Sequence, residues 1–335
     1  MPFLEGIKKM QRFKKILLVL DGKSNHKPAL TRALELAKVN KAQLKIIDVL
    51  DSPVPEVQFG TPFELEKLIL EKQDLIEMEV ESRRSKIQNL IKVSSVNDIR
   101  LSSDVLLGKP YFETIYQVLK FNFDLVIKNS EGKAGLIWGF LGNNDFNLIR
   151  KCPCPVWLIK PNQTKKFKGI LAAVDLDIIS NDNGEEKLNK KIIEIAVSLA
   201  QKEKSDLHVL HVWDFILKSD SKSLKTKLSE SQLKKLIAWE KKKREEILNQ
   251  LVSEYSPNGL NVKFHLVKGD PKKDIPKFAK NKKIELLVMG TVGRTGIPGF
   301  FIGNTSESIL NKINCSLLTV KPDGFISPVT LENEN

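Results

Sequence analysis

The stretch Glu285–Lys321, ELLVMGTVGRTGIPGFFIGNTSESILNKINCSLLTVK, decides the fold of this chain. Its apolar run at 286–289 is typical of a strand buried in a parallel sheet, and Gly290 and Gly293 follow directly. Gly303 then precedes Asn304-Thr305-Ser306-Glu307, which predicts an N-cap and the start of a helix. Glycines allow a ligand to approach the backbone closely, and free N–H groups at a helix start favour an anion. The stretch therefore predicts a strand, a phosphate-binding loop, a helix and a second strand.

Outward from this stretch, short apolar runs alternate with amphipathic runs along the whole chain. In the first half, strands are predicted at 14–21, 43–49, 105–107, 124–128 and 155–160, with helices at 27–38, 63–91, 111–120 and 145–151. In the second half, strands are predicted at 169–175, 207–212, 262–267, 286–289 and 317–320. Strands that alternate with helices predict an α/β fold with parallel, doubly wound sheets.

The two halves are copies of one pattern. Gly108-Lys109-Pro110 and Gly269-Asp270-Pro271 lie 161 residues apart, and the halves align at that offset without a gap as far as Pro161 and Pro322. The matched pairs are Asp124 with Glu285, Gly132 with Gly293, Gly135 with Gly296, Gly142 with Gly303, Asn143 with Asn304, and Cys154 with Cys315. A constant register over this length indicates duplication.

The repeat also provides an internal comparison of the glycine loops. Where the second half has Gly290, the first half has Asn129, whereas Gly132 and Gly142 are kept. A side chain at this point hinders close approach and disfavours a positive φ. The comparison predicts one intact ligand site, in the second half, and one degenerate site in the first. The Asn shared by both loops suggests a helix cap at that position in each half.

Composition indicates a globular protein of about two domains. The chain has 335 residues, of which 41% are hydrophobic and 28% charged. No apolar run approaches the roughly 20 residues of a membrane-spanning helix, and the first residues lack the apolar core of a signal peptide. Three cysteines are too few for a disulfide framework, and Cys152-Pro153-Cys154 matches neither zinc nor CxxC redox spacing. A cytoplasmic location is expected.

The formal net charge of +13 raises the question of nucleic-acid binding. Only eight of the basic residues are Arg, and the lysines alternate with acidic residues in the runs 64–81 and 234–246. This pattern is typical of solvated helix faces, and aromatic residues are not interleaved with the basic runs. Nucleic acid is therefore the less favoured partner.

These residues and spacings resemble the universal stress protein family, and the duplication resembles its tandem, E-type members. The family's nucleotide motif is Gly, two residues, Gly, nine residues, Gly and then Ser or Thr. The second half has Gly290, Gly293 and Gly303 at those spacings, with Asn304 in place of the hydroxyl residue and Thr305 after it. The resemblance covers roughly residues 14–322. It implies two flavodoxin-like domains of the adenine nucleotide alpha-hydrolase-like kind, each a five-stranded parallel sheet flanked by helices.

The domains expected from the repeat are 1–160, with the degenerate glycine motif, and 169–323, with the motif largely intact. They are joined by a polar linker at 161–168 and followed by a polar tail at 324–335. The resemblance further implies that the fifth strands of the two domains pair, which would give an internal pseudo-dimer. Pairing of whole chains into a homodimer is left open.

Members of the family that bind ATP, with Mg²⁺, hold adenine at the first two strands and the phosphates on the glycine loop. The resemblance implicates Asp175 and Val212 for the base, and Gly269 for the turn after the third strand. Met289 and Gly290 would lie near the ribose. The phosphate residues would be Gly293, Gly303, Asn304 and Thr305.

No catalytic constellation is present in the sequence. A nucleophile elbow and a Walker lysine are absent. The glycines follow the fourth strand, whereas a Rossmann fingerprint would follow the first. His208 and His211 are three apart in one strand and so on opposite faces, which argues against a shared metal. The favoured function is a nucleotide-binding stress-response protein. The alternatives are a nucleotide-free interaction scaffold with a basic surface and a slow ATP hydrolase.

Overall fold

A computed structural model describes residues 12–21, 26–51, 62–93, 98–132, 141–163, 166–176, 183–214, 229–254, 260–291 and 302–331. The first half contains β1 (Lys15–Leu20), α2 (Lys27–Asn40), β2 (Gln43–Leu50), α3 (Pro62–Val93), β3 (Leu101–Leu107), α4 (Pro110–Phe121), β4 (Leu125–Asn129), α5 (Asn143–Lys151) and β5 (Val156–Ile159). The second half contains β6 (Gly169–Ala173), α6 (Asn183–Glu203), β7 (Asp206–Trp213), α9 (Glu230–Ser253), β8 (Val262–Lys268), α10 (Pro271–Asn281), β9 (Leu286–Gly290), α11 (Asn304–Leu310) and β10 (Ser316–Val320). The predicted alternation of strands and helices is confirmed.

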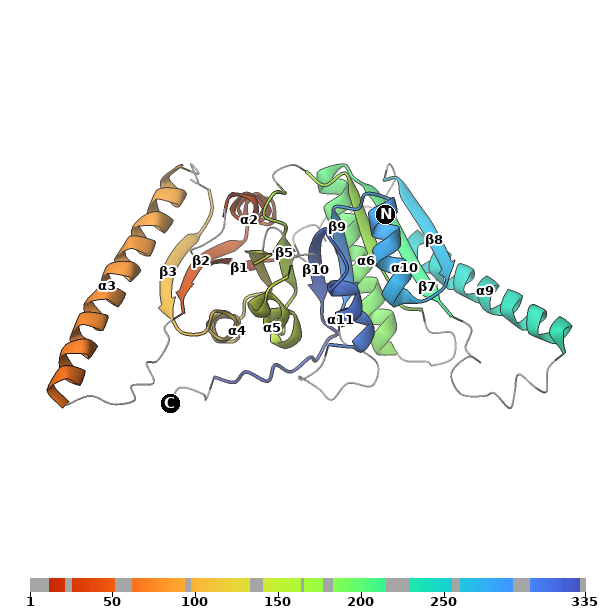
Figure 1. Cartoon of the computed structure of the whole chain (residues 1–335). Coiled ribbons are helices and arrows are strands. Elements are labelled where there is room, and N and C mark those ends of the chain that lie inside the picture. Colours follow the sequence, from red (N-terminus) through yellow and green to blue (C-terminus); the bar gives the residue numbers. More distant parts are fainter. Residues whose placement is uncertain are drawn as a thin grey trace.

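Among the described residues, ten strands form one sheet in the order β3-β2-β1-β4-β5-β10-β9-β6-β7-β8. Within each half all neighbouring strands are parallel. The halves join where β5 and β10 pair antiparallel, with Trp157 opposite Leu318. The strand order of one half is therefore the mirror of the other about this junction, as expected for two copies of a flavodoxin-like domain related by an approximate two-fold (Figure 1).

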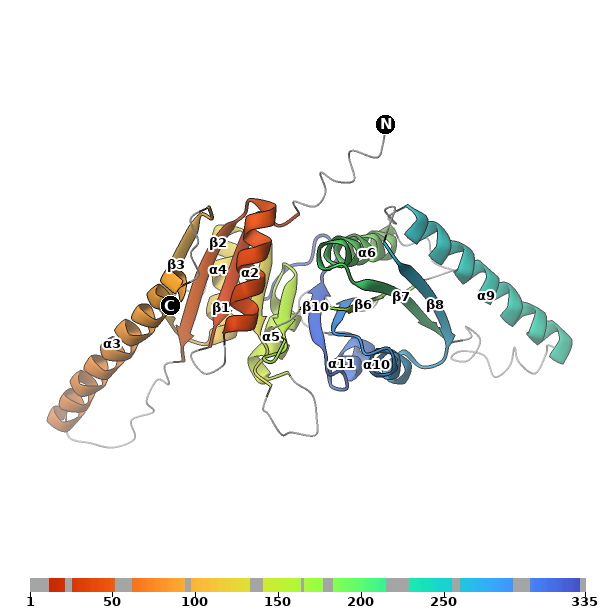
Figure 2. The same cartoon turned by 90° about the horizontal axis from the view of Figure 1, so that it is seen from above.

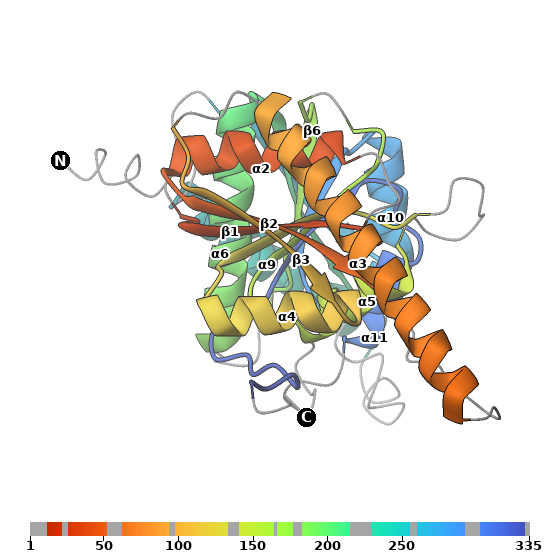
Figure 3. The same cartoon turned by 90° about the vertical axis from the view of Figure 1, so that its left-hand side faces the viewer.

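Two apolar layers cover the faces of the sheet, and each runs through both halves. Side chains alternate along a strand, so Ile16 and Leu18 join the layer under α2, α3, α6 and α9. Leu17 and Val19 join the layer under α4, α5, α10 and α11. Figures 2 and 3 show helices on both sides of the sheet, with α3 and α9 at its two outer ends. Burial on both faces explains why the strands read as continuous apolar runs.

The predicted linker and tail both contribute to the core. Phe167, in the linker, is 1% exposed and packs beside Trp157, with ring centroids 6.1 Å apart. The guanidinium of Arg32 on α2 stacks 4.3 Å from the Phe167 centroid and pairs with the buried carboxylate of Glu203 on α6. In the segment after β10, Val329 is buried in the second apolar layer. Both segments are mostly polar, but each contributes a buried apolar side chain that their overall composition did not predict.

The helix caps differ from the prediction by one residue. Gly142 and Gly303 are the N-caps of α5 and α11, and Asn143 and Asn304 are the first residues inside the helices. Neither glycine has a side chain to cap with, so the N–H groups must be satisfied from elsewhere. The prediction that the shared Asn is the cap is wrong.

None of the helices in the described part of the chain has the length and apolar character of a membrane-spanning segment.

Candidate functional site

The residues expected to bind the base lie at the carboxyl ends of β6 and β7. Asp175, just beyond β6, is exposed, and its backbone is fixed by α6: Asn189 Nδ2 donates to its carbonyl at 2.6 Å, and its N–H donates to Asn189 Oδ1 at 3.2 Å. His211 on β7 holds the same loop, because its Nδ1 lies 3.3 Å from the N–H of Leu176. Val212 is 5% exposed and packs in the core. Asp175 is therefore the accessible member of the pair.

Gly269 lies just before α10 and packs against a side chain of that helix. A Cβ there would lie 2.0 Å from Asp274 Oδ2, and that oxygen accepts from the N–H of Asp270 at 2.8 Å. At the matching Gly108, a Cβ would lie 2.7 Å from Glu113 Oε1. Both domains thus place a carboxylate of the following helix against this glycine. The close approach at Gly269 is thus accounted for by a carboxylate that caps the following helix, without reference to a ligand.

Met289 and Gly290 end β9, beside β6 and β10. Met289 is 4% exposed and is in register with Ala173. A Cβ on Gly290 would lie 3.0 Å from the Leu188 side chain on α6. In the first domain the matching Asn129 is buried, and its Oδ1 accepts from the N–H of Ala29 at 3.1 Å. Asn129 thereby caps α2, whose own N-cap residue makes no side-chain cap bond.

The start of α11 meets the end of β9. The N–H of Gly303 donates to the carbonyl of Thr291 at 3.2 Å, and Ser306 Oγ lies 3.4 Å from the carbonyl of Gly290. Asn304 and Thr305 are exposed. Within the described ranges, no side chain accepts a hydrogen bond from the N–H groups of 303–305. Gly293 lies outside the described residues.

The structure therefore brings part of the predicted site together. Asp175, Met289, Gly290 and Gly303 gather at the carboxyl edge of the adjacent strands β6 and β9. Gly269 follows β8, which β6 and β7 separate from β9. The predicted site residues that the structure brings together thus lie at the carboxyl ends of β6 and β9.

The corresponding edge of the first domain holds three interacting charges, Lys128, Glu131 and Asp145, which we call the charge cluster. Lys128 Nζ lies 2.8 Å from Asp145 Oδ1 and 3.4 Å from Glu131 Oε1. The side chains of Lys128 and Asp145 are 2% and 0% exposed. Burial opposes the charge on Lys128, but the neighbouring carboxylates outweigh it and raise the pKa of Lys128.

The carboxylates of the charge cluster occupy the helix start that a phosphate would use. Asp145 Oδ2 accepts from the N–H groups of Glu131 at 2.7 Å and Gly142 at 3.0 Å. Glu131 Oε2 accepts from the N–H of Asn144 at 3.2 Å. Carboxylates and phosphates compete for the same N–H groups and repel each other. The start of α5 is therefore occupied by carboxylates of the first domain itself.

At the offset of 161 residues, the cluster positions Lys128, Glu131 and Asp145 correspond to Met289, Val292 and Ser306 in the second domain. The second domain therefore has neither the buried cation nor the two carboxylates. The charge cluster was not predicted from the sequence, although the alignment of the two halves contains the signal. Three charged residues of the first half are aligned with three uncharged residues of the second.

The remaining candidate residues do not form a metal site. No group of three or more His, Cys, Asp or Glu side chains in the described part of the chain is arranged to hold a metal ion. His208 stacks on His265, with Nδ1 and Nε2 2.9 Å apart, whereas His211 faces the opposite layer. Cys152 and Cys154 are buried, with their sulfurs 3.6 Å apart.

Comparison with known proteins agrees with this architecture. The sequence profile of the universal stress protein family matches residues 12–160 and again 166–321. A universal stress protein E homologue of Haemophilus influenzae is 27% identical over 93% of this chain and 98% of its own. Universal stress protein E of Escherichia coli K12 is 26% identical over 97% of this chain and 99% of its own.

Solved structures give the same result for the fold. A protein of unknown function from Pseudomonas aeruginosa PAO1 superposes with a TM-score of 0.64 at 25% identity, covering 94% of this chain and 95% of that one. A universal stress protein from Archaeoglobus fulgidus superposes with a TM-score of 0.59 at 16% identity, covering 92% and 99%. Both cover the two halves together, so the tandem arrangement is common to these proteins.

Proposed function

The chain belongs to the universal stress protein family, as a tandem member of the E type, and from this premise we propose that its second domain binds an adenine nucleotide. The protein would act as a binding protein of the stress response, without rapid turnover. We place it in the cytoplasm, which its three buried, unpaired cysteines support.

The contrast between the two domains carries the proposal. In the first domain, Asp145 and Glu131 accept the hydrogen bonds of the α5 start. In the second domain, the start of α11 has no such acceptors among the described residues, and Ser306 replaces Asp145. An anion would be repelled at the first helix start and attracted to the second. The binding energy would come from backbone N–H groups, which explains how Asn304 can replace a hydroxyl residue.

The β6–β9 edge would orient the ligand. Asp175, exposed and fixed through its backbone by Asn189, would accept from the exocyclic amine of adenine. Met289 and Gly290 would form the floor beneath the ribose, and the phosphates, with Mg²⁺, would extend toward Gly293, Gly303 and Thr305. Val212 would act from the core, by supporting the loop that carries Asp175. Gly269 leaves the proposed site, because Asp274 accounts for it.

Two alternatives give different results in the same assay. A slow hydrolase would use the same loop, and steady phosphate release from bound ATP would identify it. A nucleotide-free scaffold would bind through the basic surface that accompanies the net charge of +13. A gel mobility shift with duplex DNA that weakens steeply as the salt concentration rises would support nucleic acid as its partner.

Isothermal titration of the whole protein with ATP and Mg²⁺ tests the proposal. One site per chain is expected. Gly293→Val should abolish binding, whereas Gly132→Val, at the matching position of the first domain, should leave it unchanged. The proposal fails if millimolar ATP gives neither heat nor a thermal shift, and the assignment of domains fails if the two variants exchange their effects.

A further inference from the structure

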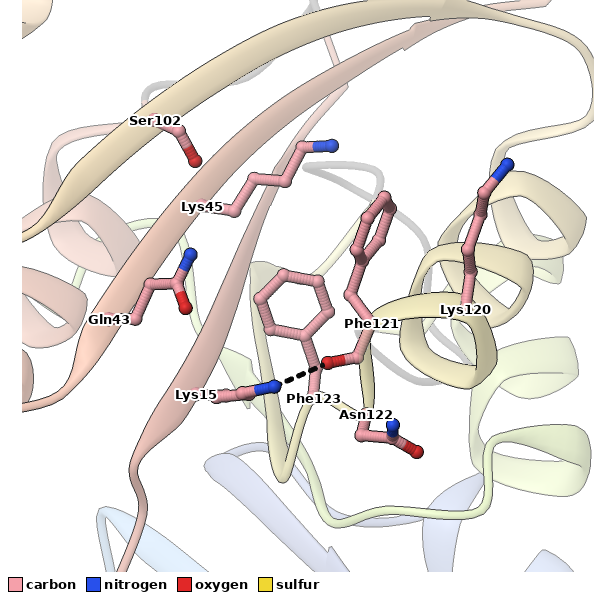
Figure 4. A pocket seen from close by; sticks show the side chains of 8 residues that line it. All are labelled: Lys15, Gln43, Lys45, Ser102, Lys120, Phe121, Asn122 and Phe123. Atoms are coloured by element: carbon pink, nitrogen blue, oxygen red, sulfur yellow. Dashed lines mark hydrogen bonds between the residues drawn. The ribbon is translucent and has the colours of Figure 1, made fainter.

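A cavity of about 310 Å³ opens at the amino ends of the strands in the first domain (Figure 4). It is lined by the strand residues Lys15, Gln43, Lys45 and Ser102 and by Lys120, Phe121, Asn122 and Phe123 from the end of α4 and the turn that follows. The charge cluster and the glycine loops lie at the carboxyl ends of the strands. Since the strands of a domain are parallel, the cavity lies at the opposite edge of the sheet from both.

Three lysine side chains line this cavity, and each has a neutral hydrogen-bond acceptor. Lys15 Nζ donates to the carbonyl of Phe121 at 3.0 Å, and Lys45 Nζ donates to Gln117 Oε1 at 2.8 Å. Lys120 Nζ lies 3.5 Å from the hydroxyl of Tyr116. No carboxylate is among the described lining residues, although Asp104 Oδ2 lies 3.7 Å from Lys45 Nζ and Asp124 Oδ1 accepts from the backbone N–H of Lys15 at 3.1 Å. The lining residues themselves therefore carry three positive charges and no negative charge.

Aromatic surface stands beside these charges. Lys45 is held in place, with its side chain 15% exposed and its ammonium 4.8 Å from the Phe121 ring centroid. Figure 4 shows the Phe121 ring between Lys45 and Lys120. Phe123 is 5% exposed and lies beneath the opening, whereas Phe121 is 42% exposed. A flat apolar group could cover Phe121 while an attached anion reaches the lysines.

The second domain has different side chains at the same place. By strand register, Lys45 with Ser102 corresponds to His208 with Lys263, and Gln43 corresponds to Asp206, since each is the first residue of its strand. Asp206 Oδ2 and Lys263 Nζ form an ion pair at 2.8 Å across the amino ends of β7 and β8. His208 stacks on His265 with ring centroids 5.1 Å apart. The second copy thus has an ion pair where the first has the uncharged side chains of Gln43 and Ser102.

We propose that this cavity binds a small organic anion, in which a carboxylate or phosphate is attached to a single flat ring. The anion would be held by lysines that line the cavity, and the ring would lie on Phe121. The volume is at the lower end of the range for ligand pockets, which suits one ring and excludes a nucleoside triphosphate. The site is independent of the nucleotide proposed for the second domain.

Titration calorimetry of the full chain with phenyl phosphate tests this site. Phenol and inorganic phosphate are the two part-ligands, and each should bind at least about tenfold more weakly, because each lacks one half of the recognition. Lys120→Gln, at an exposed helix position that cannot disturb the core, should weaken phenyl phosphate by about tenfold through the loss of one charge-assisted hydrogen bond. Lys45→Gln should weaken it at least as much.

Two further variants complete the design. Gln43→Asp with Ser102→Lys introduces the ion pair of the second domain and should abolish binding. Lys151→Gln is the matched control, because Lys151 also lies over an aromatic ring, that of Tyr111 at 4.5 Å, but outside the cavity; it should change nothing. The proposal is overturned if millimolar phenyl phosphate gives no heat, if inorganic phosphate binds equally well, or if the lysine variants behave like the control.

Discussion

The ammonium group of Lys321, at the end of β10, lies 2.7 Å from the carbonyl oxygen of Ile149 on α5. One domain thus caps the carboxyl end of a helix in the other, where a positive charge interacts favourably with the helix dipole. The Lys321 residue is 2% exposed, and burial lowers its pKa from 10.5 to about 8. Lys160, its counterpart, is half-buried, and its Nζ donates to the carbonyl of Asn314 at 3.3 Å.

Lys321 should make the stability of the protein depend on pH in the alkaline range. Between pH 8 and 10.5 the unfolded chain binds more protons at this lysine than the folded chain, so the free energy of unfolding rises with pH there. The gain is on the order of 2–3 kcal/mol. Lys321→Met has no titrating group at this position, so its free energy of unfolding should not rise in this way. Urea unfolding at about pH 7 and about pH 10 should therefore show that wild type gains more stability at high pH than the variant does. A difference in the free energy of unfolding that does not change with pH would contradict the lowered pKa. Lys160→Met controls for the loss of a strand-end lysine.

Breaking the charge cluster should cost more than removing it. Asp145→Ser leaves Lys128 buried with Glu131 alone and should destabilise the protein by about 3–5 kcal/mol. Combining Lys128→Met, Glu131→Val and Asp145→Ser reproduces the residues of the second domain and should cost less than the single change. Urea unfolding measures all three single variants and the triple. Additive losses would show that the three side chains are not coupled.

Asn129 should matter as a helix cap. Asn129→Ala removes the acceptor from the buried N–H of Ala29 and should cost about 1–2 kcal/mol in urea unfolding. Asn304→Ala, at an exposed first position of α11, is the control and should stay within about 0.5 kcal/mol. A loss at Asn304 equal to that at Asn129 would restore the sequence-based cap and count against Gly303.

The three thiols should be inert in the native protein. Cys152, Cys154 and Cys315 are buried, and burial raises the pKa of Cys315 to about 12. A chromogenic disulfide reagent at about pH 8 should therefore react slowly before unfolding and with three thiols in urea. Rapid reaction of one thiol in the folded protein would contradict this expectation and would mean that the region around that thiol opens to solvent.

Most of the fold could be predicted from the sequence, because strands buried on both faces are apolar throughout. The strand at 101–107 was predicted only from Val105, since its earlier residues are polar. As β3 is an edge strand with half-exposed side chains, Ser102 and Asp104 did not need to be apolar.

The site was less predictable because its contacts are distant in sequence. The glycine spacing identified the right edge of the sheet, but Lys128 and Asp145 are 17 residues apart and meet only after the chain has passed through the loop. Gly269 fits the family pattern and yet packs against the carboxylate of Asp274, so a motif residue can also have a packing reason. The glycine pattern does not distinguish a glycine that leaves room for a ligand from one that packs against its own chain, whereas the position of Asp274 Oδ2 does.

The antiparallel pairing of β5 with β10 within one chain has a consequence for how such a protein can change. When two identical chains pair through that edge, every substitution appears on both sides of the axis, and neither site can close without the other. Fusion of the two halves removes this constraint. A mutation in the first copy leaves the second untouched, so one copy can exchange its ligand contacts for an internal ion pair while the other keeps them.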